Sequence, residues 1–171
     1  MKIPLLTALL LLTACARQAH SEDPQATALR EKLKAIPMSE KVNFTNEEWK
    51  KILTPEQYHV LREAGTEKPY ANEYCDTYEK GTYVCAACGY PLFDSSTKFA
   101  CGTGWPAFFQ PSLKDHIRTS TDTSFGMVRE AVTCARCGSH LGHVFDDGPE
   151  PTHLRYCMNS AALKLVKAEK K

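Results

Sequence analysis

The sequence lacks a bias toward charge of either sign. It contains 21 basic and 20 acidic residues, and its formal net charge is +1 at pH 7. A nucleic-acid-binding surface usually needs clustered lysine and arginine. The even balance therefore argues against a nucleic-acid partner. The Lys-rich end is interpreted as a solvated tail; it carries Lys164, Lys167, Lys170 and Lys171.

The sequence also lacks the run of about 20 apolar residues that a permanent transmembrane helix requires. The apolar run from Ile3 to Ala14 follows Lys2 and has the length of a signal peptide. It ends in Thr13-Ala14-Cys15, and small residues directly before a cysteine resemble a bacterial lipobox. We predict that residues 1–14 are a signal peptide and that a lipid on Cys15 anchors the protein to the cell envelope of a bacterium, facing the periplasm or the exterior. The alternative is an ordinary cleaved signal peptide and a soluble secreted protein.

The chain is too short for two comfortable domains. It has 171 residues, of which 43% are hydrophobic, enough for one domain with a core. Residues 15–43 are polar, include Pro24 and Pro37, and carry only a weak helical pattern, so they are predicted to be a tether. The catalytic domain is predicted over residues 44–171, and we expect a monomer.

Two short helices are predicted before Gly65, where the sequence pattern changes from helical to strand-like. Thr45 or Asn46 can cap the first, and Thr54-Pro55-Glu56 is typical of the start of a second that Gly65 would end. After Gly65, short apolar segments alternate with turn residues and predict β-strands at residues 82–84, 91–93 and 127–129. The pattern alone predicts a mostly β fold with leading helices.

Two Cys-x-x-Cys pairs form the most specific signal. They are separated by 45 residues and supply four soft ligands with no open coordination position, as in a structural zinc site. We predict one structural Zn²⁺. The alternative is a pair of disulfides or a redox dithiol, which an oxidising compartment would favour. The four ligands are Cys85, Cys88, Cys134 and Cys137.

Cys157 lies outside this metal set. His140 and His143 follow the second pair, and a cysteine with two histidines is a candidate nucleophile with proton donors. Taken alone, such a cysteine is more often a small buried hydrophobe.

Three blocks in order resemble a known family. They are Gly104-Trp105-Pro106-Ala107-Phe108, the stretch from His140 to Pro149, and the run from Arg155 to Ser160. Together with both cysteine pairs, they are similar to the signature blocks of the B-type peptide methionine sulfoxide reductases, which act on the R epimer. The similarity extends from about Asn46 to Leu165. It implies two small antiparallel sheets, short N-terminal helices and zinc at the distal side.

The resemblance also implies a role for each site residue. Cys157 would attack the sulfoxide sulfur as a thiolate, which Arg155 and the two imidazoles would favour, and would remain as a sulfenic acid. His140 and His143 would bind the oxygen and donate protons. Asn159 would orient a water or the substrate, and Trp105 would contact the methyl group. Phe145 would form part of the wall. Arg155 would either face the substrate or brace its strand.

The sulfenic acid must then be reduced, and here the chain departs from a common family pattern. Many members have a resolving cysteine where this chain has Thr103. Cys101 is the preferred substitute and Cys75 the second choice; if neither reaches Cys157, an external thiol must act. The expected partners are oxidised proteins and peptides and a thioredoxin-like reductant.

Two other functions compete with this interpretation. A zinc-ribbon binding module would need neither Cys157 nor the two histidines. A Cys-His hydrolase would show acyl transfer with burst kinetics instead of thiol-dependent turnover.

Overall fold

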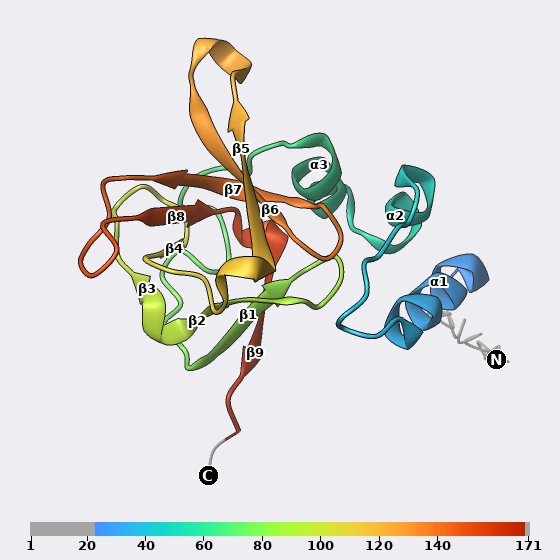
Figure 1. Cartoon of the computed structure of the whole chain (residues 1–171). Helices are drawn as coiled ribbons and strands as arrows, with labels where there is room; N and C mark the ends of the chain where they lie inside the picture. Colours follow the sequence, from blue (N-terminus) through green and yellow to red (C-terminus); the bar gives the residue numbers. More distant parts are fainter. Residues whose placement is uncertain (1–22, 170–171) are drawn as a thin grey trace, which may run out of the picture.

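The computed structural model describes residues 23–169. The predicted signal peptide, Cys15, Lys170 and Lys171 lie outside the described residues. Within the described range, no helix is long and apolar enough to cross a membrane. Three helices precede the strands (Figure 1): α1 (Pro24–Ala35), α2 (Asn46–Ile52) and α3 (Pro55–Glu63). Nine strands follow: β1 (Gly81–Cys85), β2 (Pro91–Asp94), β3 (Lys98–Phe99), β4 (Ala107–Phe108), β5 (Ile117–Asp122), β6 (Arg129–Cys134), β7 (His140–Phe145), β8 (Arg155–Met158) and β9 (Leu163–Lys167).

Both helices predicted in front of the strands are confirmed, with their capping residues. Thr45 caps α2 and Thr54 caps α3, each in a capping box that satisfies backbone N–H groups at both ends of the box. Helix α3 ends one residue earlier than the Gly65 stop suggests, because Ala64 adopts the left-handed conformation (φ 54°) and closes the helix.

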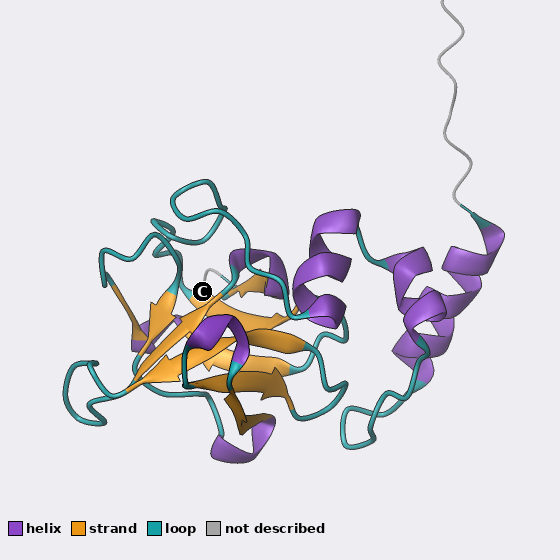
Figure 2. Ribbon diagram, turned by 90° about the horizontal axis from the view of Figure 1, so that it is seen from above, coloured by secondary structure: helices purple, strands orange, loops and turns teal. Residues whose placement is uncertain are grey.

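The described part of the predicted tether, residues 23–43, is folded against the domain. Asp23 caps α1, and Ala26 and Val42 are buried. Helix α1 lies beside α2, and Figure 2 shows the three helices gathered on one side of the sheets. The weak apolar pattern is sufficient for a helix here because Leu29 and Leu33 pack against the edge of the core rather than in its centre.

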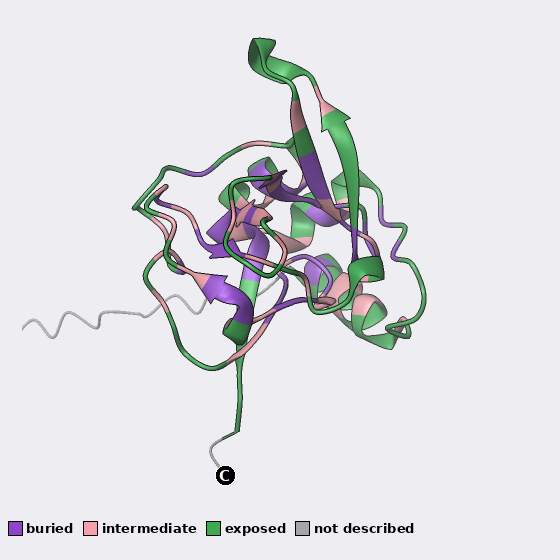
Figure 3. Ribbon diagram, turned by 60° about the vertical axis from the view of Figure 1, so that its left-hand side comes forward, coloured by how far each residue is buried: buried purple, intermediate pink, exposed green. Residues whose placement is uncertain are grey.

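The strands form two antiparallel sheets, as predicted. The three-stranded sheet has the order β2-β1-β9, and the six-stranded sheet has the order β3-β4-β8-β7-β6-β5. A core of aromatic rings joins them: Phe108 of the larger sheet stacks on Phe93 at 4.5 Å between ring centroids and meets Tyr83 edge-on at 5.0 Å. Figure 3 shows buried residues gathered on the strands at the centre of the molecule, with exposed residues on the helices, on the projecting hairpin and on many loops.

The strand predicted at residues 127–129 differs from the structure. Strand β6 begins only at Arg129, and the preceding residues form the tip of the β5–β6 hairpin, which projects from the body in Figure 1. A 3₁₀ turn with positive φ at Phe125 and Gly126 reverses the chain there. Phe125 and Val128 are therefore 88% and 81% exposed, although both are apolar.

Candidate active site and metal centre

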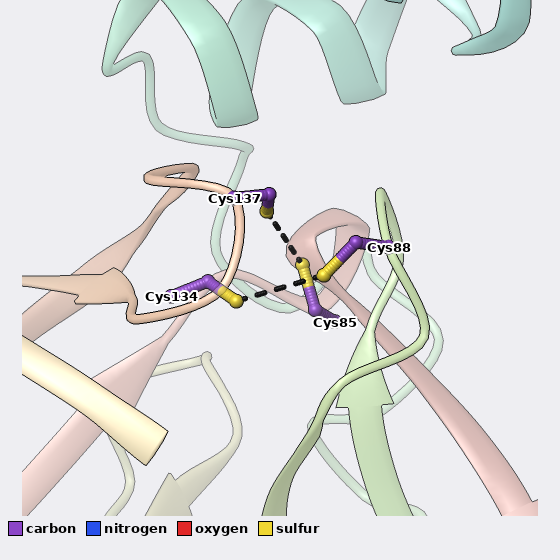
Figure 4. Close-up of side chains that lie close together, drawn as sticks. All are labelled: Cys85, Cys88, Cys134 and Cys137. Carbon is purple, nitrogen blue, oxygen red and sulfur yellow. Dashed lines mark hydrogen bonds between the residues drawn. The ribbon is translucent and has the colours of Figure 1, made fainter. Parts of the chain in front are cut away.

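The four predicted metal ligands come together from the two sheets. Cys85 ends β1 and Cys88 lies in the turn that follows, whereas Cys134 ends β6 and Cys137 lies in the equivalent turn of the larger sheet. In Figure 4 the four sulfurs point toward one another from these two turns. All four are buried, and their sulfur atoms lie within 4.8 Å of one another.

The geometry fits a tetrahedral metal ion. The Sγ atoms of Cys85 and Cys137, and those of Cys88 and Cys134, are 3.7 Å apart. Zn–S bonds of about 2.3 Å give tetrahedron edges of about 3.8 Å. A disulfide would require about 2.05 Å. Hydrogen bonding to the neighbouring thiols and burial raise the pKa of Cys85, so a bound dication would have to displace thiol protons.

Cys157 and His143 face each other across neighbouring strands. The antiparallel register of β7 and β8 pairs His143 with Cys157 and Phe145 with Arg155, so all four side chains share one face of the sheet. Gly142 makes this pairing close: a Cβ added there would lie 2.2 Å from the carbonyl oxygen of Cys157. Only glycine allows the two strands to approach so closely at this point.

A pocket of about 110 Å³ opens beside Cys157. This volume is below the roughly 300 Å³ typical of sites for drug-sized ligands, so it suits the end of one side chain. Five of the predicted site residues line it, namely Trp105, His143, Phe145, Cys157 and Asn159. The rest of the lining comes from Thr66, Arg129, Gly142 and Met158.

Asp122 connects His143 to Arg129. Its Oδ2 atom lies 2.7 Å from Nε2 of His143 and 2.8 Å from Nη2 of Arg129. Hydrogen bonds from Ser124 and His143 hold the pKa of Asp122 well below its usual value, so the carboxylate is ionised across the ordinary pH range. It therefore accepts a hydrogen bond from His143 and orients the ring.

His140 lies apart from this pocket. Its ring meets that of His143 edge-on at 5.3 Å between centroids, but it lines a different and larger groove of about 810 Å³ beside α3. The residue is 7% exposed, and among the described residues its Nε2 atom has no hydrogen-bond partner. Burial lowers the pKa of His140 to about 4, so the ring is neutral at pH 7.

The thiol of Cys157 is not activated as strongly as the sequence suggests. Burial raises the pKa of Cys157, while the hydrogen bond from Thr103 and the charge of Arg155 lower it by less. Arg155 is engaged elsewhere: its guanidinium makes two bonds to Asp147, at 2.8 and 2.9 Å, and lies 4.3 Å from the ring centre of Phe145. This arrangement favours the expectation that Arg155 braces its strand.

Thr103 bridges two cysteines. Its Oγ1 atom lies 3.0 Å from the sulfur of Cys101 and 3.7 Å from the sulfur of Cys157. Cys75 is held through its backbone: its N–H donates to Asn72, and its carbonyl accepts from the Lys98 ammonium. Burial raises the pKa of the Cys75 thiol, and the Cys101 thiol is close enough to contribute to that shift.

Trp105 and Asn159 are both held by Glu67. The indole N–H of Trp105 donates to the Glu67 carbonyl at 3.2 Å, and the Glu67 N–H donates to Oδ1 of Asn159 at 3.1 Å.

Three residues around the site were not predicted from the sequence: Glu67, Asp122 and Arg129. None belongs to a recognisable motif, because each reaches the site only through the folding of a loop or hairpin.

Comparison with known proteins gives concordant matches. The chain matches the family model described as "SelR domain" over residues 53–167. It is 55% identical over 129 residues to the "Peptide methionine sulfoxide reductase MsrB" of Methanosarcina mazei, covering 75% of this chain and 92% of that protein. Proteins of the same name match from Saccharophagus degradans (53% over 130 residues, 76% and 97% covered) and Bradyrhizobium diazoefficiens (55% over 126 residues, 74% and 91% covered).

Proposed function

Since the chain belongs to the SelR domain family of B-type peptide methionine sulfoxide reductases, we propose that it reduces methionine-(R)-sulfoxide in oxidised proteins and peptides through a sulfenic acid on Cys157. One observation carries the proposal. Cys157 opens into a pocket that admits one side-chain end, with a histidine opposite it and an aromatic wall beside it.

The chemistry balances with these groups. The Cys157 thiolate attacks the sulfoxide sulfur and forms an S–S bond. The protonated oxygen then moves to the Cys157 sulfur as the S–O and S–S bonds break, which releases the thioether and leaves a sulfenic acid. The Nε2–H of His143 is donated to ionised Asp122, so the proton that His143 supplies to the oxygen in this step is the one on Nδ1. The Trp105 face contacts the methyl group, and this contact would favour one epimer. His140 would act only indirectly, since it does not line the pocket.

Cys101 would then resolve the sulfenic acid. Its thiolate attacks the Cys157 sulfur, water leaves, and a Cys157–Cys101 disulfide forms. The position of Thr103 supports Cys101 over Cys75, because the Thr103 hydroxyl contacts the sulfurs of both Cys101 and Cys157. A thioredoxin-like dithiol would reduce the disulfide and itself become oxidised.

The metal group would be a structural Zn²⁺ held by the four buried cysteines, with no open position for substrate.

We also propose that the chain is exported and anchored through Cys15, on the lipobox-like run alone. Metabolic labelling with a fatty acid, compared between wild type and Cys15→Ala, tests the anchor.

The deciding experiment measures thioredoxin-dependent turnover of each epimer of a methionine sulfoxide peptide by the full chain. We expect reduction of the R epimer only, loss of turnover in Cys157→Ser, and slower recycling in Cys101→Ser but not in Cys75→Ser. Absence of turnover with any thiol donor would refute the proposal. Recycling at the wild-type rate in both Cys101→Ser and Cys75→Ser would remove Cys101 from the mechanism and leave direct attack by an external thiol.

A further inference from the structure

Glu67 is a buried acid that the proposed reaction does not use. It lies in the loop between α3 and β1 and is 7% exposed. Its carboxylate accepts the N–H of Ser160 at 2.5 Å and the N–H of Ala161 at 2.7 Å. These two residues directly follow Asn159, so the carboxylate fixes the chain where it leaves the active-site strand β8.

The main chain of Glu67 links two walls of the Cys157 pocket. Its carbonyl oxygen accepts the indole N–H of Trp105, and its N–H donates to the side-chain oxygen of Asn159. The Asn159 amide group in turn donates to the carbonyl of Leu141 on β7. Trp105 and Asn159 come from segments more than 50 residues apart in sequence, and Glu67 bonds to both.

Fold stability alone does not account for an acid at this position. Burial raises the pKa of Glu67 by more than the two backbone N–H groups lower it, so ionisation of this carboxyl is disfavoured on folding. A buried acid whose ionisation is disfavoured in this way is a candidate for a role in geometry rather than in stability.

We infer that Glu67 is a positioning residue, whose anchored carboxylate holds its own main chain so that Trp105 and Asn159 are set at the separation that the sulfoxide group requires. The inference rests on the proposed function. In it, the Trp105 wall receives the methyl group, and Asn159 lines the same pocket beside Cys157. Glu67 itself touches neither the substrate nor Cys157.

Glu67→Gln tests this role with almost no change of volume. The carboxamide keeps one acceptor oxygen but turns an NH₂ donor toward one of the two backbone N–H donors. We expect the KM for a methionine-(R)-sulfoxide peptide to rise about tenfold, with a smaller effect on kcat. Alkylation of Cys157 by iodoacetamide should stay unchanged, because the strand that carries it keeps its pairing.

Iodide quenching of tryptophan fluorescence reports the wall independently of activity. Of the two tryptophans, Trp49 is fully buried and Trp105 is partly exposed, so quenching follows Trp105. We expect stronger quenching in Glu67→Gln. Glu48→Gln is the matched control, since that carboxylate also accepts a backbone N–H, from Thr45 at 2.8 Å, but belongs to α2.

The outcomes separate the two hypotheses. If wild type reduces the R epimer and Glu67→Gln shows the wild-type KM and quenching with only a lower Tm, Glu67 serves the fold and the inference is overturned. If wild type reduces no sulfoxide, the proposed function fails instead. Quenching then still decides the anchoring of Trp105: unchanged quenching overturns it, and stronger quenching supports it.

Discussion

At the scale of single residues, the reactivity of Cys157 depends on two opposed effects. Burial raises the pKa of its thiol, and the positive charge of Arg155 works in the other direction. Since the thiolate is the nucleophile, Arg155→Met should raise the pKa of Cys157 further and slow its alkylation by iodoacetamide several-fold at pH 7.5.

Measurement of the alkylation rate from pH 6 to pH 10 checks this expectation. The two rates should converge at high pH, where both proteins are thiolates. Arg118→Met is the matched control, because Arg118 is exposed on β5. An unchanged pH profile in Arg155→Met would mean that Asp147, which pairs with Arg155, already neutralises its effect on Cys157.

His140 makes a second prediction, which concerns stability. The pKa of His140 is about 4 in the folded protein, below the ordinary value of about 6.5, so the unfolded chain binds a proton at a higher pH than the folded chain does. The free energy of unfolding should therefore fall as pH decreases from about 6.5, by up to about 3 kcal/mol at pH 4. His140→Gln should lose this component of the acid sensitivity.

Urea unfolding at pH 7.0, 5.5 and 4.5 measures the contribution of His140 to the pH dependence of stability. That contribution is the difference in the free energy of unfolding between wild type and His140→Gln at each pH. His153→Asn serves as the control, because His153 is exposed and Asn tolerates its positive φ of 57°. Equal pH dependence in wild type and His140→Gln would show that the buried ring accepts a proton without cost.

At the scale of elements, Arg136 ties the N-terminal segment to the metal centre. The residue is 4% exposed, and its guanidinium donates to the carbonyls of Ile36, Pro37, Glu40 and Cys88 at 2.6 to 3.2 Å. Arg136→Met should cost about 2 to 4 kcal/mol, since it leaves buried carbonyls without their charged donor. Residues 36–41 should also become sensitive to protease.

Urea unfolding and limited proteolysis of the metal-loaded protein test this prediction, again with Arg118→Met as the exposed control. Stability within 0.5 kcal/mol of wild type would contradict it, and water would then satisfy the same carbonyls.

Arg136 also illustrates what the sequence could and could not predict. Caps and turn residues are local signals, so the starts of α2 and α3 and the two cysteine turns were predictable from residues a few positions apart. Helix α1 was not, because the contacts that hold its end come from an arginine 100 positions away. The site divides in the same way: Cys157, His143 and Trp105 lie in motifs, whereas Asp122 and Glu67 enter it only through tertiary structure.

At the scale of the whole molecule, the metal centre joins the two sheets. One cysteine pair lies at the end of β1 in the smaller sheet and the other at the end of β6 in the larger one. The active-site pocket is lined by the larger sheet and by loops, and none of its lining residues belongs to a strand of the smaller sheet. A metal ion held by these four cysteines would therefore stabilise the arrangement of the sheets without contacting the substrate.

Removal of the metal should consequently lower the free energy of unfolding by several kcal/mol and broaden the unfolding transition, because the two sheets then unfold less cooperatively. Hydrogen bonding to neighbouring thiols and burial raise the pKa of Cys85 and of Cys88, so these thiols must lose protons to bind the ion, and metal affinity should also fall as pH decreases. Metal content by mass spectrometry, with urea unfolding before and after chelation, measures both effects. Cys88→Ser should lose the ion, whereas Cys75→Ser, a matched change outside the cluster, should retain one ion per chain. A chelated protein with wild-type stability would mean that the aromatic core of Tyr83, Phe93 and Phe108 holds the sheets together unaided.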